Sequence, residues 1–574
     1  EQIRSLQESG GLVPDRYARR RFVEGRGPEM PRTVERVLLA RIDRLTATEK
    51  DVLVAASVLG REFDRDLLGR LTGEVTDVAG ALDGLGAIDL IRPERLADQA
   101  RFRFKHALIQ EAAYGTLLKR RRRELHRKAA DAIGSLYEGR LDQVAGILGR
   151  HLHEAGEPEL AVPHLVAAGD RAREAFANEE ALSWYARASD AVREIPDRAN
   201  GDDWVDAEAD LHVRRAGVLD LTGRFEEARE AYRRALGVVP AEDRVKVARV
   251  RTNAASVEIS DHRYDDALAE LDRAEEALAA SRTAPPDHAE AMTAWLDIQD
   301  ARMAVFYWVG DLEAYTELID RVQPIVESRG TPLQRVEFFD SILTYRMRLE
   351  RYVLSEETVE VARAALDAAE RLGDDMRVAW SRFELGFALV WAGRPDEATD
   401  VLHATKLEAD RMGDVVLRSR SLMYRLVAHR RRGDPTAVER AIDPVIEAAR
   451  AASLPEYEAM AIANRSWVHG RNGRDSDAAT DARAAVDLLR SLPIHYPFEW
   501  MALWPLLGVE LRRGHTAEAV KCGRDMLDER QQPLPAELRA NLEAAVEEWD
   551  DGRAEAALSA LRSAVHLARR KAFV

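Results

Sequence analysis

The chain has 574 residues, of which 46% are hydrophobic and 32% are charged, and its formal net charge is −17. This is an ordinary globular balance with ample apolar material for large cores. The acidic total argues against a protein that coats nucleic acids, because phosphate binding needs clustered positive surface. Cys522 is the only cysteine, which excludes an internal disulfide framework and a cysteine-based zinc site.

No uninterrupted apolar run approaches the roughly 18 to 20 residues that a membrane helix needs. Together with the single cysteine and the lack of a recognisable signal peptide, this predicts a cytoplasmic location without membrane contact. The chain opens with Glu1-Gln2-Ile3 rather than an initiator methionine. We therefore expect it to be a piece of a longer protein.

Residues 31–85 have the spacing of four helices. Apolar side chains recur on one helical face over residues 31–45, which begin with Pro31, a residue favoured in the first helical turn. Thr46-Ala47-Thr48-Glu49 is a capping box, which predicts the start of a second helix. Two shorter helices are predicted around residues 64–71 and 75–85.

The clearest β signal in the chain follows these helices. Residues 87–91 form a mostly apolar run before Pro93, and residues 101–105 alternate between basic and aromatic side chains. Helices followed by a two-stranded wing predict a winged-helix domain over residues 31–125. A long helix is expected from His106 onward, leading into linker helices and irregular helix pairs over residues 126–200.

Residues 201–574 contain an internal repeat. Short turns, most of them centred on glycine, recur every 38 to 48 residues, often with a small residue five positions further on, as in Gly393 and Ala398. Glycine allows a tight turn, and a small side chain lets two helices approach closely. The pattern predicts a stack of antiparallel helix pairs. The fold class is therefore mainly α, a winged-helix domain followed by a tetratricopeptide-like α-solenoid.

Tryptophans recur near the first helix of several repeat units. They are Trp295, Trp308, Trp380, Trp391, Trp467, Trp500 and Trp504. A ligand-stacking groove and a packed core between repeats both fit this pattern, and the packed core is favoured because large aromatic side chains mostly bury their area in packing. The concave face of such a stack is suited to gripping a partner.

Several segments resemble one bacterial family. They are residues 31–45, 55–63, 102–114 (Phe-Arg-Phe-Lys-His-Ala-Leu-Ile-Gln-Glu-Ala-Ala-Tyr) and 151–156 (His-Leu-His-Glu-Ala-Gly). The family is the signal-transduction ATPases with numerous domains, in particular those fused behind class III adenylate or guanylate cyclase domains. The large LuxR-type regulators with a maltose-regulator-like ATPase are related. The resemblance is specific over about residues 1–195, and residues 1–30 look like the tail of the family's ATPase region.

The resemblance implies that an upstream domain of the same protein holds ATP or ADP, that the winged helix closes over the nucleotide, and that the repeat arm senses a signal. This chain lacks the family's phosphate-binding loop, because no G-x-x-x-x-G-K-[ST] motif occurs in it. A cyclase catalytic segment is not recognisable either. We therefore expect the chain by itself neither to hydrolyse ATP nor to make a cyclic nucleotide, and to hold no cofactor of its own.

His106 is the candidate nucleotide-sensing residue. It lies where a strand is predicted to pass into a helix, and helix N-termini favour anions. The segment Lys105-His106-Ala107 resembles the Met-His-Asp signature of related ATPases, whose histidine contacts the phosphate of ADP. An imidazole can donate a hydrogen bond to a phosphate oxygen. The alternative is a structural histidine at the junction of wing and helix.

Arg120, Arg121, Arg122 and Arg123 belong to the densest positive run and are candidates for phosphate or DNA contact. Consecutive residues spread around a helix rather than forming one stripe, and no aromatic residues are interleaved with them. A solvated helix that pairs with acidic neighbours is favoured, and DNA is not favoured as a partner. His126, His151, His153 and His164 invite a metal hypothesis, but residues two apart diverge by about 200° around a helix, so packing histidines are favoured.

These observations leave three hypotheses. The first is the signal-sensing arm of a nucleotide-switched ATPase, attached to a cyclase or a transcription regulator, that recognises a protein or small-molecule signal on its concave face. The second is a stand-alone repeat scaffold for protein–protein interaction. The third is a winged-helix regulator that binds DNA.

Overall fold

The computed structural model describes residues 12–14, 20–22, 32–73, 77–96, 99–196, 202–278, 286, 288–571 and 573. It divides into two compact units. Unit 1 contains Glu1–Arg171 and Ser183–Arg198, and unit 2 contains Ala172–Leu182 and Ala199–Val574. Apart from two short strands, the predicted tail over residues 1–30 lies outside the described residues.

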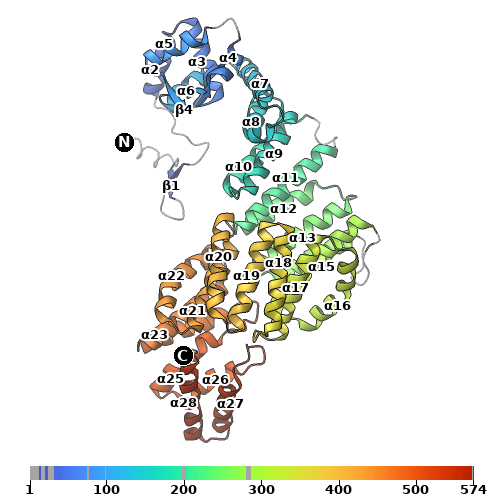
Figure 1. Ribbon diagram of the computed structural model, residues 1–574, viewed down its shortest axis with the longest axis vertical. Helices are drawn as coiled ribbons and strands as arrows, with labels where there is room; N and C mark the ends of the chain where they lie inside the picture. The colour runs from blue at the N-terminus through green and yellow to red at the C-terminus, as the bar shows by residue number, and fades with distance from the viewer. Residues whose placement is uncertain are drawn as a thin grey trace. The chain divides into compact units, whose positions relative to one another are not determined.

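Unit 1 combines helices with two small sheets (Figure 1). Its elements are β1 (Leu12–Pro14), β2 (Arg20–Phe22), α2 (Arg32–Ile42), α3 (Ala47–Leu59), β3 (Glu62–Asp64), α4 (Arg65–Thr72), α5 (Val78–Ala87), β4 (Ile91–Leu96), β5 (Gln99–Phe104), α6 (Ala107–Gly115), α7 (Lys119–Leu136), the 3-10 helix η1 (Leu141–Val144) and α8 (Ala145–Ala155). Helices α9 (Pro158–Glu174) and α10 (Asn178–Glu194) contribute residues to both units.

The capping box predicted at the start of α3 is confirmed. The Thr46 hydroxyl accepts a hydrogen bond from the Glu49 amide at 3.3 Å, and the Glu49 carboxylate accepts one from the Thr46 amide at 2.9 Å. Helix α4 likewise begins after Asp64, whose carboxylate accepts hydrogen bonds from the first turn. These caps satisfy amide groups that have no partner within the helix.

The three-stranded sheet of unit 1 has the order β3-β5-β4, with both neighbours antiparallel to β5, and β1 pairs with β2 in a separate antiparallel sheet. Phe104 at the end of β5 is completely buried, and Leu53 and Leu85 complete the core between sheet and helices. Phe104 therefore anchors the start of α6 to the core.

The strands of this region differ from the sequence-based prediction in two ways. The sequence predicts the first strand at 87–91, which is wrong, because α5 extends to Ala87 and β4 runs over Ile91–Leu96 with Pro93 inside it. A proline is tolerated there because β4 is an edge strand, so the missing N–H can face away from the ladder. Strand β3, only three residues long, was missed.

The single long helix expected from His106 is also wrong, because two helices occupy its place. The amides of Thr116 and Leu117 donate to the carbonyls of Ala113 and Tyr114, three residues back, in a tightened turn that ends α6. Leu118 is extended and starts α7. The break between the helices turns the chain so that Tyr114 contacts α7.

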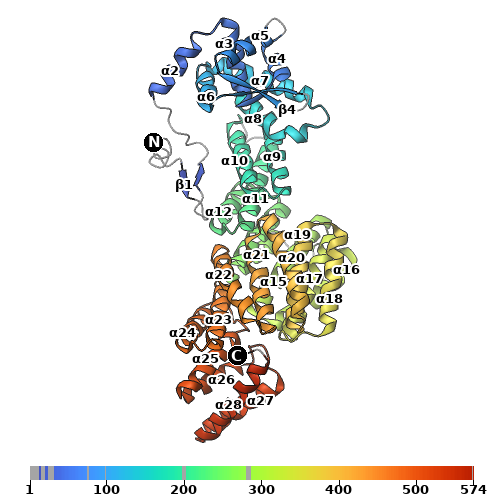
Figure 2. The ribbon, with the colours of Figure 1, turned by 60° about the vertical axis from the view of Figure 1, so that its left-hand side comes forward.

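Unit 2 is a series of helices joined mostly by short turns. Its helices are α11 (Asp202–Leu221), α12 (Phe225–Val238), α13 (Arg244–Ser260), α14 (Tyr264–Ala277), α15 (Ala289–Val309), α16 (Leu312–Arg329), α17 (Pro332–Leu349), α18 (Glu356–Leu372), α19 (Asp375–Trp391), α20 (Pro395–Met412), α21 (Val415–Arg431), α22 (Pro435–Ala451), α23 (Pro455–Arg471), α24 (Asp475–Arg490), α25 (Trp500–Arg513), α26 (Thr516–Met526), α27 (Ala536–Asp550) and α28 (Ala554–Arg570). Helices α17 to α20 stand side by side in both views (Figures 1 and 2).

The predicted stack of helix pairs is confirmed. The predicted turn residues adopt left-handed backbone angles, for example Gly393 with φ 81° and the non-glycine His262 with φ 60°. The small residues five positions later are fully buried, as Ala398 is. The short side chain at this position lets the two helices of a pair pack closely.

The repeats of unit 2 also contact each other over long stretches of sequence. The Asn178 side-chain amide donates to the Met412 carbonyl at 2.9 Å. The guanidinium of Arg351 donates to the Gln531 carbonyl at 2.7 Å, although the two residues are four hairpins apart. The array of helices is therefore curved, and segments far apart in the sequence are in contact.

Among the helices that the structure describes, none combines the length and the apolar character needed to cross a membrane.

Candidate functional site

His106, the predicted nucleotide-sensing residue, is the N-cap residue of α6 and is exposed. Its side chain makes no capping hydrogen bond to the helix, so the imidazole is not used to close the helix end. The backbone of unit 1 thus presents a histidine at a helix N-terminus directly after the central strand, as the sequence indicated.

The arginine run lies on the first turns of α7. Arg121 pairs with Glu124 at 2.6 Å, and Arg122 covers the ring of Tyr114 with its guanidinium carbon 4.3 Å from the ring centroid. Arg120 and Arg123 are exposed. Among the described residues, no hydrogen bond or ion pair joins His106 to these arginines, so the two predicted sites remain separate.

Two of the four candidate histidines meet in the interior of unit 1. His126 and His151 lie 2.9 Å apart between their Nδ1 atoms, and the Tyr114 hydroxyl lies 2.9 Å from His126 Nε2. Burial lowers the pKa of His126 to about 4 and that of His151 to about 3. Both histidines are therefore neutral packing residues that link α6, α7 and α8. Across the described residues, no three His, Cys, Asp or Glu side chains are grouped as a metal site would require.

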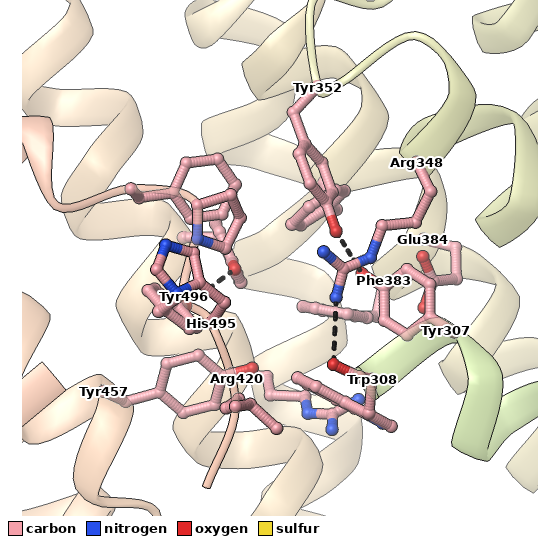
Figure 3. Close-up of a pocket in the computed structure, with 15 residues that line it drawn as sticks. Tyr307, Trp308, Arg348, Tyr352, Phe383, Glu384, Arg420, Tyr457, His495 and Tyr496 are labelled. Atoms are coloured by element: carbon pink, nitrogen blue, oxygen red, sulfur yellow. Dashed lines mark hydrogen bonds between the residues drawn. The ribbon is translucent and has the colours of Figure 1, made fainter. Parts of the chain in front are cut away.

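Unit 2 contains a pocket that the sequence did not predict, called the inner pocket here. Its walls come from the first helices of five successive hairpins, α15, α17, α19, α21 and α23. The turn between α17 and α18 and the irregular segment 491–499 between α24 and α25 complete them (Figure 3). The lining residues are Tyr307, Trp308, Arg348, Tyr352, Phe383, Glu384, Phe387, Arg420, Tyr424, Tyr457, Ile494, His495, Tyr496, Pro497 and Phe498. Because five successive helices converge on one small cavity, this side of the array is concave.

Segment 491–499 closes one side of the inner pocket. Phe498 stacks on Trp391 with ring centroids 4.4 Å apart, and it meets Tyr352 edge-on at 5.0 Å. The Tyr496 hydroxyl lies 3.3 Å from that of Tyr424. Gln532 donates a hydrogen bond to the Tyr352 carbonyl. The segment is thus held as part of the core rather than as a surface loop.

Arg348 reaches into the inner pocket from α17 (Figure 3). Its guanidinium donates to the Trp308 carbonyl at 3.3 Å and lies over the rings of Tyr307 and Tyr352, 4.7 and 5.5 Å from their centroids. Its Nε atom is buried without a hydrogen-bond partner.

Arg420 lines the pocket from α21. Its guanidinium carbon lies 5.0 Å from the ring centroid of Trp308 and 5.2 Å from that of Trp380, and its Nε atom is also buried without a partner. Such cation–π contacts offset part of the cost of removing a cation from water. Within the described part of the chain, neither Arg348 nor Arg420 lies within ion-pair distance of a carboxylate.

Glu384 is the acidic member of the lining. Burial, reinforced by the neighbouring Asp340, raises the pKa of Glu384 to about 7. Burial raises the pKa of Asp340 to about 7 as well, against the lowering effect of Arg377. Near neutral pH, Glu384 is therefore only partly ionised and does not fully balance the two arginines.

The cavity left between these side chains has a volume of about 40 Å³. Aromatic faces, two guanidinium groups and one carboxyl group line it, so it can bind a small chemical group through hydrogen bonds and charge. Sequence reasoning missed the site because its residues come from positions 307 to 498 and no local pattern joins them. The one available signal was the aromatic, proline-containing stretch Ile494-His495-Tyr496-Pro497-Phe498, which interrupts the helical repeat.

Of the repeated tryptophans, Trp295, Trp467 and Trp504 are fully buried, in agreement with the packing interpretation. Trp308 differs, because it lines the inner pocket and contacts Arg420.

Comparison with known proteins finds no family model that matches the chain. A stretch of 172 residues is 30% identical to an uncharacterized protein of Rhizobium meliloti (strain 1021), covering 30% of this chain and 17% of that protein. The chain thus spans only a small part of the curated relative that it matches.

Among solved structures, a Rap protein complexed with competence and sporulation factor is 13% identical, with 67% of this chain and 98% of that chain covered and a TM-score of 0.46. A signal-transduction ATPase with numerous domains and a tetratricopeptide repeat sensor, from Pyrococcus horikoshii, is 13% identical, with 88% and 66% covered and a TM-score of 0.38.

Proposed function

We propose that this chain is the regulatory and signal-sensing arm of a nucleotide-switched signalling ATPase. In this proposal an upstream domain of the same protein binds ATP or ADP, a winged helix in unit 1 transmits the signal, and the helical repeats of unit 2 recognise a protein or small molecule. The observation that carries the sensing role is the inner pocket, a small pocket partly open to solvent and lined by two arginines that form no ion pair among the described residues.

The order of elements in unit 1 supports the winged helix. Helix α3, the short strand β3, helices α4 and α5 and the hairpin β4–β5 follow one another, and β5 lies between the other two strands. This is the helix–strand–helix–helix–wing order of that domain, and α6 begins directly behind the wing.

His106 is the proposed contact to the nucleotide. Its exposed imidazole at the N-terminus of α6 has no capping role, so it can donate a hydrogen bond to a phosphate oxygen of ADP held by the upstream domain. The nucleotide itself would be held by that domain, and this chain would report its presence through α6.

The attachment to an adenylate or guanylate cyclase is the finer part of the proposal and rests on the family resemblance of residues 1–195. The stretch of 172 residues shared with the Rhizobium protein occupies only 17% of that protein, which is compatible with a place for this chain within a longer polypeptide.

Deletion of residues 202–574 from the intact protein tests the sensing role. We expect the basal output, measured as nucleotide exchange or cyclase activity, to change because the arm no longer restrains or stimulates the switch. An output that is the same with and without the arm would overturn the proposal and favour a scaffold that only gathers partners.

The substitution His106→Ala tests the nucleotide contact. We expect the purified intact protein to retain less ADP than the wild type, measured by chromatography of the released nucleotide. His403→Ala is the matched control, because His403 is an exposed histidine on α20. Equal ADP retention in all three proteins would show that His106 is only structural.

DNA binding through the winged helix is the remaining alternative. It requires duplex binding that weakens with salt and is lost when Arg120–Arg123 are neutralised. The spread of these side chains around α7, with Arg122 engaged on Tyr114, favours the protein-packing role of the domain.

A further inference from the structure

We propose that the inner pocket recognises a carboxylate group, presented either by a small organic acid with an aromatic or aliphatic body or by the C-terminus of a peptide. This inference deepens the proposed function, since it names the chemistry of the signal that the repeats would sense. Its two sources share one recognition element, a planar monoanion placed against Arg348 and Arg420.

A comparison of the arginines in the inner pocket with those in a neighbouring surface hollow supports an anionic ligand. Segment 491–499 also borders a wider surface hollow of about 570 Å³, where the cations already have partners. There, Arg490 pairs with Glu499 at 2.7 Å and Arg530 pairs with Asp528 at 2.7 Å.

In the inner pocket, by contrast, the direct neighbours of Arg348 and Arg420 are aromatic faces and one carbonyl. The carboxylates of Glu384 and Glu456 act on the charge of Arg420 only from beyond ion-pair distance. The guanidinium groups of the inner pocket therefore have no direct anionic partner among the described residues.

The other titratable groups of the lining do not form a direct ion pair with these guanidinium groups. His495 is half-buried, and burial lowers its pKa, so it is mostly neutral at neutral pH. Glu384 is only partly ionised there, because burial and Asp340 raise its pKa. A ligand anion could therefore pair directly with the guanidinium groups, and the protonated form of Glu384 can donate a hydrogen bond to it.

The size of the cavity selects the group that enters. A single buried water molecule needs a cavity volume of roughly 10–15 Å³. The inner pocket has a volume of about 40 Å³, so it holds about three non-hydrogen atoms, the number in a carboxylate group. A guanidinium is a planar fork that fits a carboxylate through two parallel hydrogen bonds. A phosphate dianion has more atoms than this space holds, and its second negative charge makes it more sensitive than a carboxylate to the ionised fraction of Glu384.

The space inside the pocket has room for little more than the carboxylate, because the rings around it are already packed together, with Phe387 and Tyr424 4.5 Å apart. The apolar body of the ligand would therefore extend toward the solvent side of the pocket, where the edges of aromatic side chains can pack against it. Recognition would combine one charged contact inside the pocket with apolar packing at its entrance.

The test compares acids with their uncharged amides on the purified chain. The probes are 3-phenylpropanoate and 3-phenylpropanamide as the small-molecule pair, N-acetylglycyl-phenylalanine and its C-terminal amide as the peptide pair, and phenyl phosphate. Binding is measured by calorimetry and by the shift of the melting temperature, since a ligand that binds only the folded state raises it. We expect at least one acid to bind at least tenfold more tightly than its amide and than phenyl phosphate.

Variants locate the binding. Arg420→Met and Arg348→Met should each weaken binding of the acid at least tenfold, while Arg418→Met should leave it unchanged, because Arg418 lies on the same helix but pairs with Asp410 at 2.9 Å outside the lining. Arg420→Lys keeps the charge and loses the planar fork, so it should bind the acid with intermediate affinity.

The outcomes are distinct. Preference for the small acid or for the peptide identifies the source of the carboxylate, whereas tighter binding of phenyl phosphate, equal binding of acids and amides, or no binding by any acid would overturn the inference. The comparison of acid with amide uses the wild-type chain and does not depend on how the variants fold. It also leaves the proposed function untouched, because deletion of the arm could still change the output if the signal had no carboxylate.

Discussion

Phe498→Ala tests whether segment 491–499 is an integral part of the repeat array. Phe498 is 2% exposed, stacks on Trp391 and meets Tyr352 edge-on. A buried aromatic side chain removes about 150–250 Å² from water, and at about 25 cal/mol per Å² the lower figure corresponds to about 4 kcal/mol. Because a cavity would replace the ring, we expect the free energy of unfolding to fall by about 3–5 kcal/mol.

The matched control is Phe339→Ala. Phe339 lies on α17 and is 46% exposed, so its loss should change the free energy of unfolding by only about 0.5 kcal/mol, as for other surface substitutions. Urea titration followed by far-ultraviolet circular dichroism measures both variants. If Phe498→Ala costs no more than Phe339→Ala, the packing described for this segment is wrong.

A local measurement completes this test, because repeat arrays can unfold in stages and a single unfolding energy then loses its meaning. Hydrogen exchange reports each segment separately. We expect exchange in Phe498→Ala to rise mainly in segment 491–499 and in the turn at Tyr352, which contacts it. A uniform rise over the whole of unit 2 would contradict this local role.

Three further predictions concern titration, close packing and capping. Burial raises the pKa of Glu384 and of Asp340 to about 7, so between about pH 4 and pH 7 the folded state holds more protons than the unfolded state. The free energy of unfolding should therefore fall as pH rises through this window, and Glu384→Gln should flatten the slope in urea titrations at several pH values. Gly386→Ala should destabilise by about 1–3 kcal/mol, since a Cβ would lie 2.7 Å from the Leu402 side chain. Gly237→Ala, in a helix with open space around it, should instead stabilise by about 0.5–1 kcal/mol, and equal effects would refute the packing argument. Thr46→Ala removes the capping hydroxyl of α3 and should lower the stability of unit 1 by about 0.5–2 kcal/mol, measured by thermal unfolding with Thr46→Ser as the control that keeps it.

Local chemistry made much of the fold predictable. The turn at Gly393, the capping box at Thr46 and the helix start at Asp64 each depend on a few adjacent residues, and each lies where the sequence placed it. The errors arose where tertiary context decides. Strand β3 is too short to leave a pattern, and Pro93 reads as a stop signal although it lies inside an edge strand.

The inner pocket was beyond prediction for a different reason. Arg348 and Arg420 are ordinary basic residues in helices rich in charge, and nothing nearby in the sequence distinguishes them from Arg346 or Arg418. Their role depends on the curvature of the array, which brings the first helices of five hairpins and segment 491–499 together around the inner pocket. The curvature of the array is the sum of many small rotations between neighbouring repeats. The sequence patterns of the individual repeats do not allow this sum to be predicted.

The composition of the concave side supports a role beyond stability. Between the helices of a pair the array is packed by apolar side chains such as Ala398 and Leu402, which are fully buried. Around the inner pocket the sequence instead places Arg348, Arg420 and Glu384, and partly burying charged groups without direct ion pairs costs free energy.

Arg430 is also buried without an ion pair, but its guanidinium donates to the Met501 and Phe573 carbonyls and so joins distant parts of the array. The structure gives Arg420 no hydrogen bond of this kind among the described residues. Local departures from consistent packing are expected at functional sites, so we infer that the charges of the inner pocket are kept for what they bind.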